Sequence, residues 1–209
     1  MKTLRDIGEN GLLRGILPRL PQRADTLVGP GDDCAVVRVP GSSDDWLFTT
    51  DPVIEHRHFL PETPARLVGR KAIARAVSDV AAMGGTPLWI LVDLVAPAST
   101  PLARIRGLYD GLIAAAKKWN LGILGGDTAE GDVLELHITG VGRLPRGAAV
   151  LRSGARAGDL VYVTGALGGA YLPGRRHHLL FEPRLEAGRF LAEKKFATAM
   201  MDLSDGLAA

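Results

Sequence analysis

Residues 64–97, "PARLVGRKAIARAVSDVAAMGGTPLWILVDLVAP", carry the clearest helix and strand signals in the chain. Apolar side chains recur in the first half at helical spacing: Ile73, Val77, Val80 and Ala81. This spacing predicts an amphipathic helix, and the glycine pair at 84–85 is typical of a helix end. The run "LWILVDLVAP" (88–97) is almost wholly apolar and predicts a buried strand that Pro97 stops.

The same reading extends to the rest of the chain. Helices are expected at 4–20, 100–120 and 182–195, and strands at 34–39, 45–51, 121–126, 133–144 and 160–166. Helices alternating with hairpin-like strand pairs indicate an α/β (α+β) fold with a mixed or antiparallel sheet packed by helices. A linker rich in Gly, Arg and Ala near 144–158 suggests two domains, 1–147 and an incomplete second α/β domain at 148–209.

Composition excludes several classes of protein. The net charge is +2 without a block of like charges, so neither nucleic acid nor a membrane surface is an expected partner. We interpret "GRRHH" (174–178) as a solvated loop. The single cysteine, Cys34, allows no disulfide framework, and it is expected to be a small buried residue. With no signal peptide and no bilayer-spanning stretch, a soluble cytoplasmic protein is expected.

Aspartates recur beside glycines and hydroxyl residues in five places. The stretches are "GPGDDCAVV" (29–37), "LFTTDP" (47–52), "AVSDVAAMGG" (76–85), "GGDTAEGD" (125–132) and "MMDLSDGL" (200–207). Their carboxylate and hydroxyl oxygens suit Mg²⁺, which commonly shares its shell with substrate phosphate. If these turns meet in space, they indicate phosphoryl chemistry.

Each of these motifs also has a structural interpretation, because Asp beside Gly or Ser is common in turns and helix caps. Asp79 fits that interpretation less well, since a carboxylate among small apolar residues inside a helix is costly to bury without a cation or a donor. "TTD" after "WLF" is similarly unusual at the end of a strand. The sequence lacks the Walker, dinucleotide-binding and protein-kinase motifs. Any ATP site therefore has another architecture.

Taken in order, a larger set of motifs resembles the thiamine-monophosphate kinases. The motifs are "GPGDDCAVV", "FTTDPVIEHRHF", "GRKAIARAVSDVAAMGGTP", "LGGDT", "LRSGARAGDLVYVTGALGGA" and "MDLSDGLA", from about residue 28 onward. This family shares a superfamily with aminoimidazole ribonucleotide synthetase, selenophosphate synthetase and a hydrogenase-maturation protein. The resemblance implies direct in-line transfer of the γ-phosphoryl group of ATP to thiamine monophosphate, with several Mg²⁺ ions and no covalent nucleophile.

The resemblance also implies roles for individual residues. Metal ligands are expected at Asp33, Thr49, Thr50, Asp51, Asp79, Asp127, Asp202 and Asp205, with Asp79 bridging more than one ion. Nucleotide contacts are expected from Tyr109, Gly126, Asp127, Arg152 and Ser204. His58 is expected to meet thiamine monophosphate, and His56, which stands where the family commonly has glycine, is its nearby competitor.

The family has a further domain after "DLSDGLA" that supplies part of the thiamine pocket. This sequence does not contain that stretch, so the chain alone is expected to have weak or no kinase activity. Two alternatives stay open: another ATP-using member of the superfamily, and a non-catalytic nucleotide-binding module. The resemblance finally implies a homodimer formed through the sheets of the N-terminal domains.

Overall fold

The computed structural model describes residues 2–170, 176–204 and 206–207. Its helices are α1 (Leu4–Ile16), α2 (Ala65–Ala82), α3 (Leu102–Lys118), α4 (His177–Leu180) and α5 (Leu185–Glu193), with 3₁₀ turns at Leu17–Arg19 and Arg152–Gly154. Its strands are β1 (Thr26–Val28), β2 (Ala35–Val37), β3 (Asp44–Ile54), β4 (Thr86–Ala96), β5 (Gly122–Glu130) and β6 (Glu135–Pro145). The predicted mixed α/β fold is confirmed.

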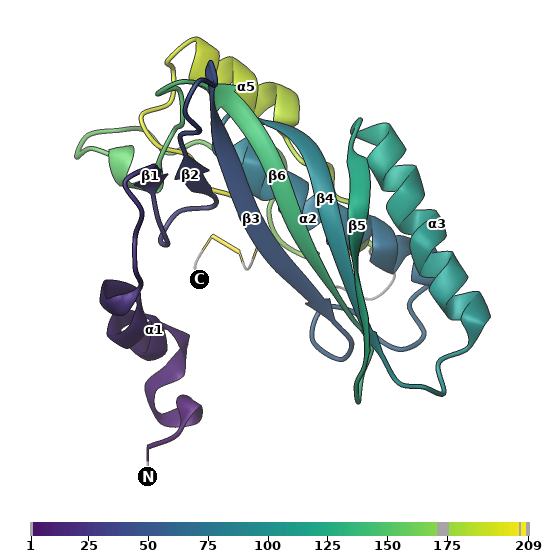
Figure 1. Ribbon diagram of the computed structural model, residues 1–209. Coiled ribbons are helices and arrows are strands. Elements are labelled where there is room, and N and C mark those ends of the chain that lie inside the picture. The colour runs from purple at the N-terminus through teal and green to yellow at the C-terminus, as the bar shows by residue number, and fades with distance from the viewer. Residues whose placement is uncertain (1, 171–175, 205, 208–209) are drawn as a thin grey trace.

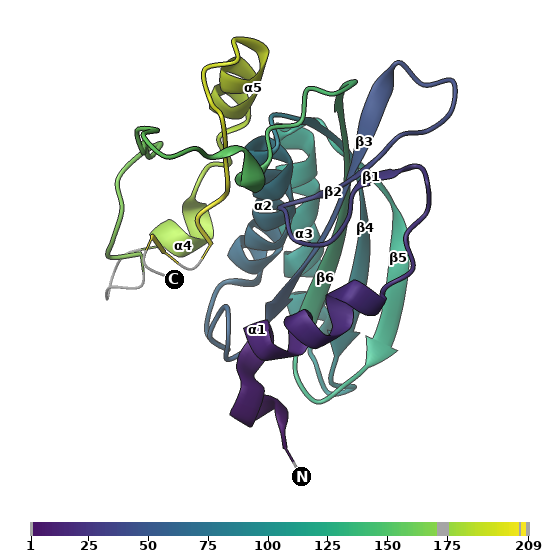
Figure 2. The ribbon, with the colours of Figure 1, turned by 90° about the vertical axis from the view of Figure 1, so that its left-hand side faces the viewer.

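The six strands form one mixed sheet in the order β1-β2-β3-β6-β4-β5. Neighbouring strands run antiparallel except β4 and β5, which are parallel and are joined by α3. A parallel pair needs such a crossover, because a short turn cannot return the chain to the same edge. Helices α2 and α3 lie side by side on one face of the sheet (Figures 1 and 2).

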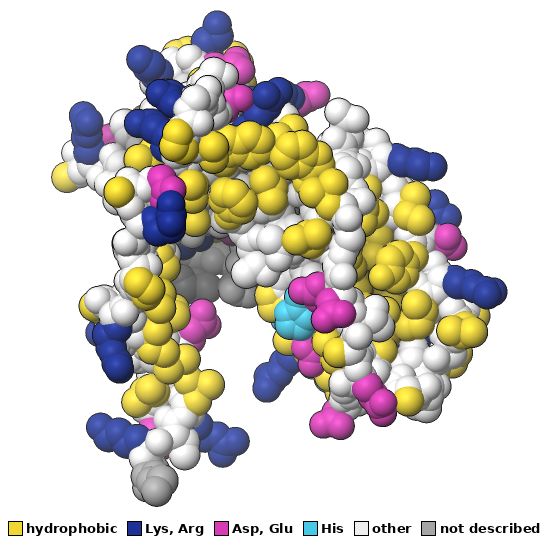
Figure 3. All heavy atoms as spheres, in the orientation of Figure 1, with side chains coloured by type: hydrophobic (Ala, Val, Ile, Leu, Met, Phe, Trp, Pro, Cys, Tyr) yellow, Lys and Arg dark blue, Asp and Glu magenta, His cyan; other side chains and the backbone are white. Residues whose placement is uncertain are grey.

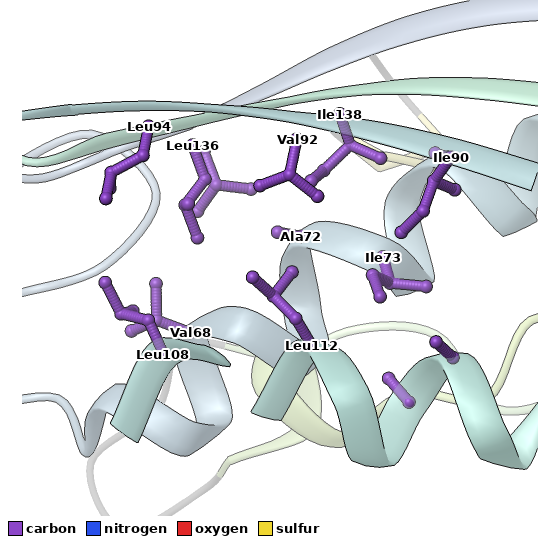
Figure 4. Close-up of a cluster of buried hydrophobic side chains, with 14 of the residues drawn as sticks. Val68, Ala72, Ile73, Ile90, Val92, Leu94, Leu108, Leu112, Leu136 and Ile138 are labelled. Carbon is purple, nitrogen blue, oxygen red and sulfur yellow. The ribbon is translucent and has the colours of Figure 1, made fainter. Parts of the chain in front are cut away.

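The main core lies between that sheet face and the two helices (Figure 4). Strands β4 and β6 contribute aliphatic side chains, which include Ile90, Val92, Leu94, Leu136 and Ile138. The helices contribute Val68, Ala72, Ile73, Leu108 and Leu112. All are at most 5% exposed. Burial of this aliphatic set is the main driving force for docking the helices onto the sheet.

Glycines let α2 and α3 approach one another closely. A Cβ atom added to Gly69 would lie 2.1 Å from the carbonyl oxygen of Leu108. One added to Gly111 would lie 2.0 Å from the carbonyl oxygen of Arg66. Both distances are far below van der Waals contact, so any side chain at either position would separate the helices.

Two sequence predictions differ from the structure. Residues 160–166 form no strand, and Leu160, Val161 and Tyr162 are 77–84% exposed. The described residues offer this apolar run no neighbouring strand, and a strand is stable only when it is paired. The expected helix at 4–20 is interrupted at Gly8, whose φ is 62°, and none of the residues of α1 is buried.

The expected loop "GRRHH" is also only partly correct. Residues 174 and 175 lie outside the described residues, whereas His177 and His178 begin the short helix α4. His178 Nδ1 lies 3.2 Å from the Nζ atom of Lys71, which is buried in α2. Among the described residues, no helix has both the length and the apolar composition needed to cross a bilayer.

Candidate functional site

An acidic cavity of about 180 Å³ lies where β3, α2 and the 32–33 and 202–204 segments meet. Its lining residues are Asp32, Asp33, Thr49, Thr50, Asp51, Arg75, Asp79, Arg152, Asp202 and Ser204. All of them except Asp32 and Arg75 are predicted metal ligands or nucleotide contacts, and they come from separate motifs along the chain. Asp32 belongs to the same aspartate motif as Asp33, and Arg75 is not among the residues for which the sequence predicts a role.

Strand β3 contributes Thr49, Thr50 and Asp51 to the cavity lining, and side chains alternate between the two faces of a strand. Thr49 and Asp51 point toward α2, where Thr49 donates a hydrogen bond of 2.5 Å to Asp79 Oδ2. Thr50 lies between them, so we expect its main chain, and not its side chain, to face the cavity. The middle of β3 and the last turns of α2 are therefore held together by residues of the cavity.

Three carboxylates form the centre of the cavity. Oxygen atoms of Asp33, Asp79 and Asp202 all lie within 4.8 Å of one another. Such a group of oxygen ligands fits a hard divalent cation, and Mg²⁺ in particular. Asp33 is buried and the other two are half-buried, so a bound cation would be only partly screened by water.

Two of these carboxylates have raised pKa values. Burial raises the pKa of Asp79 to about 8, and the nearby Asp202, Asp51 and Asp33 add to the rise against the hydrogen bond from Thr49. Burial and the charges of Asp33 and Asp51 raise the pKa of Asp202 to about 6, opposed by Ser78 and Arg152. Packing several negative charges together is unfavourable without a cation, which is the electrostatic condition of a metal site.

Two arginines reduce this negative charge. Arg152 binds both carboxylate oxygens of Asp33, and its main-chain N–H donates to Asp32 Oδ2 at 3.0 Å. Arg75 binds both oxygens of Asp51, at 2.7 and 2.8 Å. Paired N–H donors of this kind match carboxylate and phosphate groups equally well.

Other predicted site residues lie elsewhere. Asp127 is exposed on β5, and its N–H donates to Asp93 Oδ1 at 3.0 Å. Gly126 packs against β4, where an added Cβ would lie 1.7 Å from the carbonyl oxygen of Val92. Tyr109 on α3 packs against the main core. None of these three lines the cavity, and Asp205 lies outside the described residues.

His58 lies in the loop after β3 and does not line the cavity either. Its Nδ1 accepts a hydrogen bond of 2.9 Å from the N–H of Ile54, so the proton of a neutral ring is carried by Nε2. Lys71 donates a hydrogen bond of 2.7 Å to the carbonyl oxygen of His58. Burial lowers the pKa of Lys71 to about 8.

Cys34 is 1% exposed beside the acidic cavity. Burial raises the pKa of its thiol well above the ordinary range, and the charges of Asp79 and Asp33 raise it further. A thiol in these surroundings is a poor nucleophile, because the thiolate is the reactive form. The expectation of a small buried residue is confirmed.

Sequence comparison shows that this chain is similar to known proteins. The family described as "AIR synthase related protein, N-terminal domain" matches residues 31–144. A thiamine-monophosphate kinase from Mycobacterium tuberculosis (strain CDC 1551 / Oshkosh) is 35% identical over 99% of this chain and 66% of its own length. The kinase from Rhodopirellula baltica is 41% identical over 93% of this chain and 61% of its own length. This chain therefore spans about two thirds of such relatives, or slightly less.

Solved structures of similar proteins have the same fold as this chain. The structure titled "AaThiL complexed with AMPPCP and TMP" superposes with a TM-score of 0.86 at 32% identity, over 99% of this chain and 69% of that protein. The thiamine monophosphate kinase of Aquifex aeolicus superposes with a TM-score of 0.80 at 29% identity, over 100% of this chain and 71% of that protein.

Proposed function

Because this chain belongs to the AIR synthase related family and, within it, to the thiamine-monophosphate kinases, we propose that it serves ATP-dependent phosphorylation of thiamine monophosphate to thiamine diphosphate. The observation that carries the proposal is the convergence of Asp33, Asp79 and Asp202 in one cavity. The similar protein solved in complex with AMPPCP and TMP supports the two substrates. A cytoplasmic location stays a prediction.

The residues of the cavity would have two kinds of role in such a reaction, metal binding and contact with the nucleotide. Asp33, Asp79 and Asp202 would hold Mg²⁺, with Thr49, Thr50, Asp51 and Asp205 as further ligands. Bound there, Mg²⁺ would neutralise phosphate oxygens and align them for in-line transfer. Arg152 would exchange the carboxylate of Asp33 for a phosphate group, since its planar fork suits both. Ser204, which lines the same cavity, would contact the nucleotide.

Residues outside the cavity complete the proposal. Gly126 and Asp127 on β5 and Tyr109 on α3 would contribute to nucleotide or metal binding. His58 would present its Nε2 side to the phosphate of thiamine monophosphate, held by the main-chain hydrogen bond to Nδ1. The chain spans only part of its relatives, so the rest of the thiamine pocket would come from residues that this sequence does not contain.

The first test is nucleotide binding by this chain. Calorimetry with a non-hydrolysable ATP analogue is expected to show binding in the presence of Mg²⁺, and loss of most of that binding in excess EDTA. The reason is that polyphosphate and carboxylates repel one another unless a cation lies between them. The Asp110→Asn variant, which changes an exposed carboxylate on α3, is the matched control and should bind normally.

Analogue binding that is absent, or that is equally strong in EDTA, would contradict the proposed metal-nucleotide site. The complete gene product then separates the alternatives in an assay of ADP release. Release that depends on thiamine monophosphate supports the kinase. Binding without turnover supports the non-catalytic module, and turnover on a different acceptor supports another member of the superfamily.

We also propose that two copies of the chain pair through their sheets. The sheet face opposite α2 and α3 carries exposed apolar side chains, which gather over β3, β4 and β6 (Figure 3). Phe48, Trp89 and Leu91 are 38–40% exposed there, and the rings of Trp46 and Trp89 stack with centroids 5.7 Å apart. A broad apolar surface of this kind marks an interaction site, and a second sheet would cover it.

Replacing Leu91 by glutamate should convert a dimer into a monomer in sedimentation velocity experiments. The charge would be buried without a partner in the paired sheets, whereas in the monomer it would be solvated. Glu130→Gln, at the exposed end of β5, provides a control on the same sheet. A wild-type chain that sediments as a monomer, or a Leu91→Glu variant that remains dimeric, would refute this mode of pairing.

A further inference from the structure

Arg75 forms an ion pair with Asp51 inside the acidic cavity, and the proposed metal-binding roles give Arg75 no part in the site. Its Nε donates to Asp51 Oδ2 at 2.8 Å, and its terminal nitrogen donates to Asp51 Oδ1 at 2.7 Å. The side chains are only 19% and 16% exposed. The ion pair is therefore largely removed from water and is screened less than a surface pair.

The position of Arg75 follows from the helix that carries it. Arg75 precedes Asp79 by four residues on α2, so both side chains lie on the same helix face and reach the same cavity. The guanidinium is stabilised by Asp51, Asp79 and Asp202 together. It is thus a positive charge in the lining of the acidic cavity, in addition to that of Arg152.

Asp51 lines the cavity but lies outside the group of three carboxylates at its centre. Asp33, Asp79 and Asp202 have oxygens within 4.8 Å of one another, and Asp51 is not part of that group. Both of its oxygens are engaged by the guanidinium fork of Arg75, as both oxygens of Asp33 are by Arg152. The guanidinium group of Arg75 lies against the carboxylate of Asp51, where a metal cation would otherwise bind.

We propose that Arg75 is a resident counter-ion that competes with divalent metal for Asp51 and so weakens metal binding at this site. This inference rests on the proposed function, because it takes the cavity to be a Mg²⁺ site. In the metal-free chain the ion pair holds Asp51 in position and offsets part of the repulsion among the carboxylates. Arg75 would give up at least one oxygen of Asp51 to a bound metal ion, and the N–H donors released in this way would be available to a substrate phosphate.

The test is the affinity of the chain for the metal alone. Mg²⁺ and Mn²⁺ are titrated into metal-free protein by calorimetry, and the dissociation constants are checked from the metal-dependent rise in melting temperature. The Arg75→Gln variant is expected to bind metal about tenfold more tightly than the wild type, because a positive charge beside the site is removed. Arg75→Lys keeps the charge without the paired donors and is expected to bind about threefold more tightly.

Arg23→Gln is the matched control. It also removes one positive charge and one arginine–aspartate ion pair, with Asp25, but Arg23 is 84% exposed and does not line the cavity. Its dissociation constant for metal should equal that of the wild type. A purely structural role for Arg75 would lower the melting temperature of metal-free Arg75→Gln without tightening metal binding.

The outcomes separate this inference from the proposed function. Metal binding that is unchanged or weaker in both Arg75 variants overturns the inference and leaves the kinase proposal standing. If Arg75→Gln fails to fold, Arg75→Lys alone decides in the same way. A wild-type chain that binds no metal alone overturns the inference, and the proposed function is then decided by analogue binding in Mg²⁺ and in EDTA. Tighter metal binding in the variants, with no ADP release by the complete gene product, supports the inference and contradicts the kinase.

Discussion

Asp79→Asn is expected to make the metal-free chain more stable at pH 8 and to abolish its stabilisation by Mg²⁺. Burial raises the pKa of Asp79 to about 8 in the folded chain, against an ordinary value of 3.8. Asparagine has nearly the same shape, and its oxygen can accept the hydrogen bond from Thr49. The substitution therefore removes an unfavourable charge from the metal-free site and a ligand from the metal-bound one.

The direction of the pH dependence follows from proton binding. Below about pH 4, Asp79 is protonated in both the folded and the unfolded chain. Between about pH 4 and pH 8 the folded chain holds the proton and the unfolded chain does not, so the free energy of unfolding falls as the pH rises. The loss is complete above pH 8 and amounts to at most about 6 kcal/mol, since the pKa rises by about four units and each unit corresponds to about 1.4 kcal/mol.

Denaturation with urea at pH 5 and pH 8, in EDTA and in excess Mg²⁺, measures this effect. Asp79→Asn should gain stability over the wild type at pH 8 in EDTA and show little difference at pH 5. Asp110→Asn, on an exposed face of α3, should match the wild type throughout. In the complete gene product, Asp79→Asn should reduce ATP turnover about a thousandfold. A less stable variant at pH 8, or one that Mg²⁺ still stabilises, would remove Asp79 from the metal site.

Gly111→Ala should destabilise the chain by about 3 kcal/mol, although alanine is the better helix former. The helix preference of alanine would by itself favour the variant by about 1 kcal/mol. The added methyl group, however, would lie 2.0 Å from the carbonyl oxygen of Arg66 and 2.8 Å from its carbonyl carbon. The backbone of α2 can avoid this overlap only by moving away, which opens the core beneath both helices.

Thermal unfolding measures this loss, with an expected fall in melting temperature of about 10 °C for a chain of this size. Gly15→Ala is the control, because an added Cβ at position 15 of α1 meets nothing within 4 Å. That variant should be as stable as the wild type or slightly more stable. A Gly111→Ala chain with wild-type stability would mean that the two helices are not held at this close distance.

Local patterns predicted much of the fold. The helix now bounded as Ala65–Ala82 was identified from its apolar stripe and its glycine end, and both features are local in sequence. Residues 160–166 were wrongly predicted as a strand, because an apolar run does not reveal whether a partner strand exists. The boundary between two domains stays a prediction.

Part of the candidate site could also be predicted from the sequence. Asp79 was singled out because a carboxylate inside a helix among small residues needs compensation, and the structure surrounds it with Thr49, Asp33 and Asp202. The ion pair between Arg75 and Asp51 was not predicted, because it depends on how β3 docks against α2. Lys71 lies four residues before Arg75 on α2, yet it is 3% exposed. Helical spacing predicts on which side of a helix a residue lies, but it does not predict whether another part of the chain covers that side.

Strand β6 has a consequence for how the nascent chain is protected during synthesis. It lies between β3 and β4, pairing with Asp44–Ile54 on one edge and with residues from Thr86 to Val95 on the other. Until residue 145 has left the ribosome, these two earlier strands lack their common neighbour and present open edges beside apolar side chains. While β6 is still being synthesised, chaperones would be needed to cover these open edges. Slowing translation before residue 135 should lengthen this period and increase aggregation.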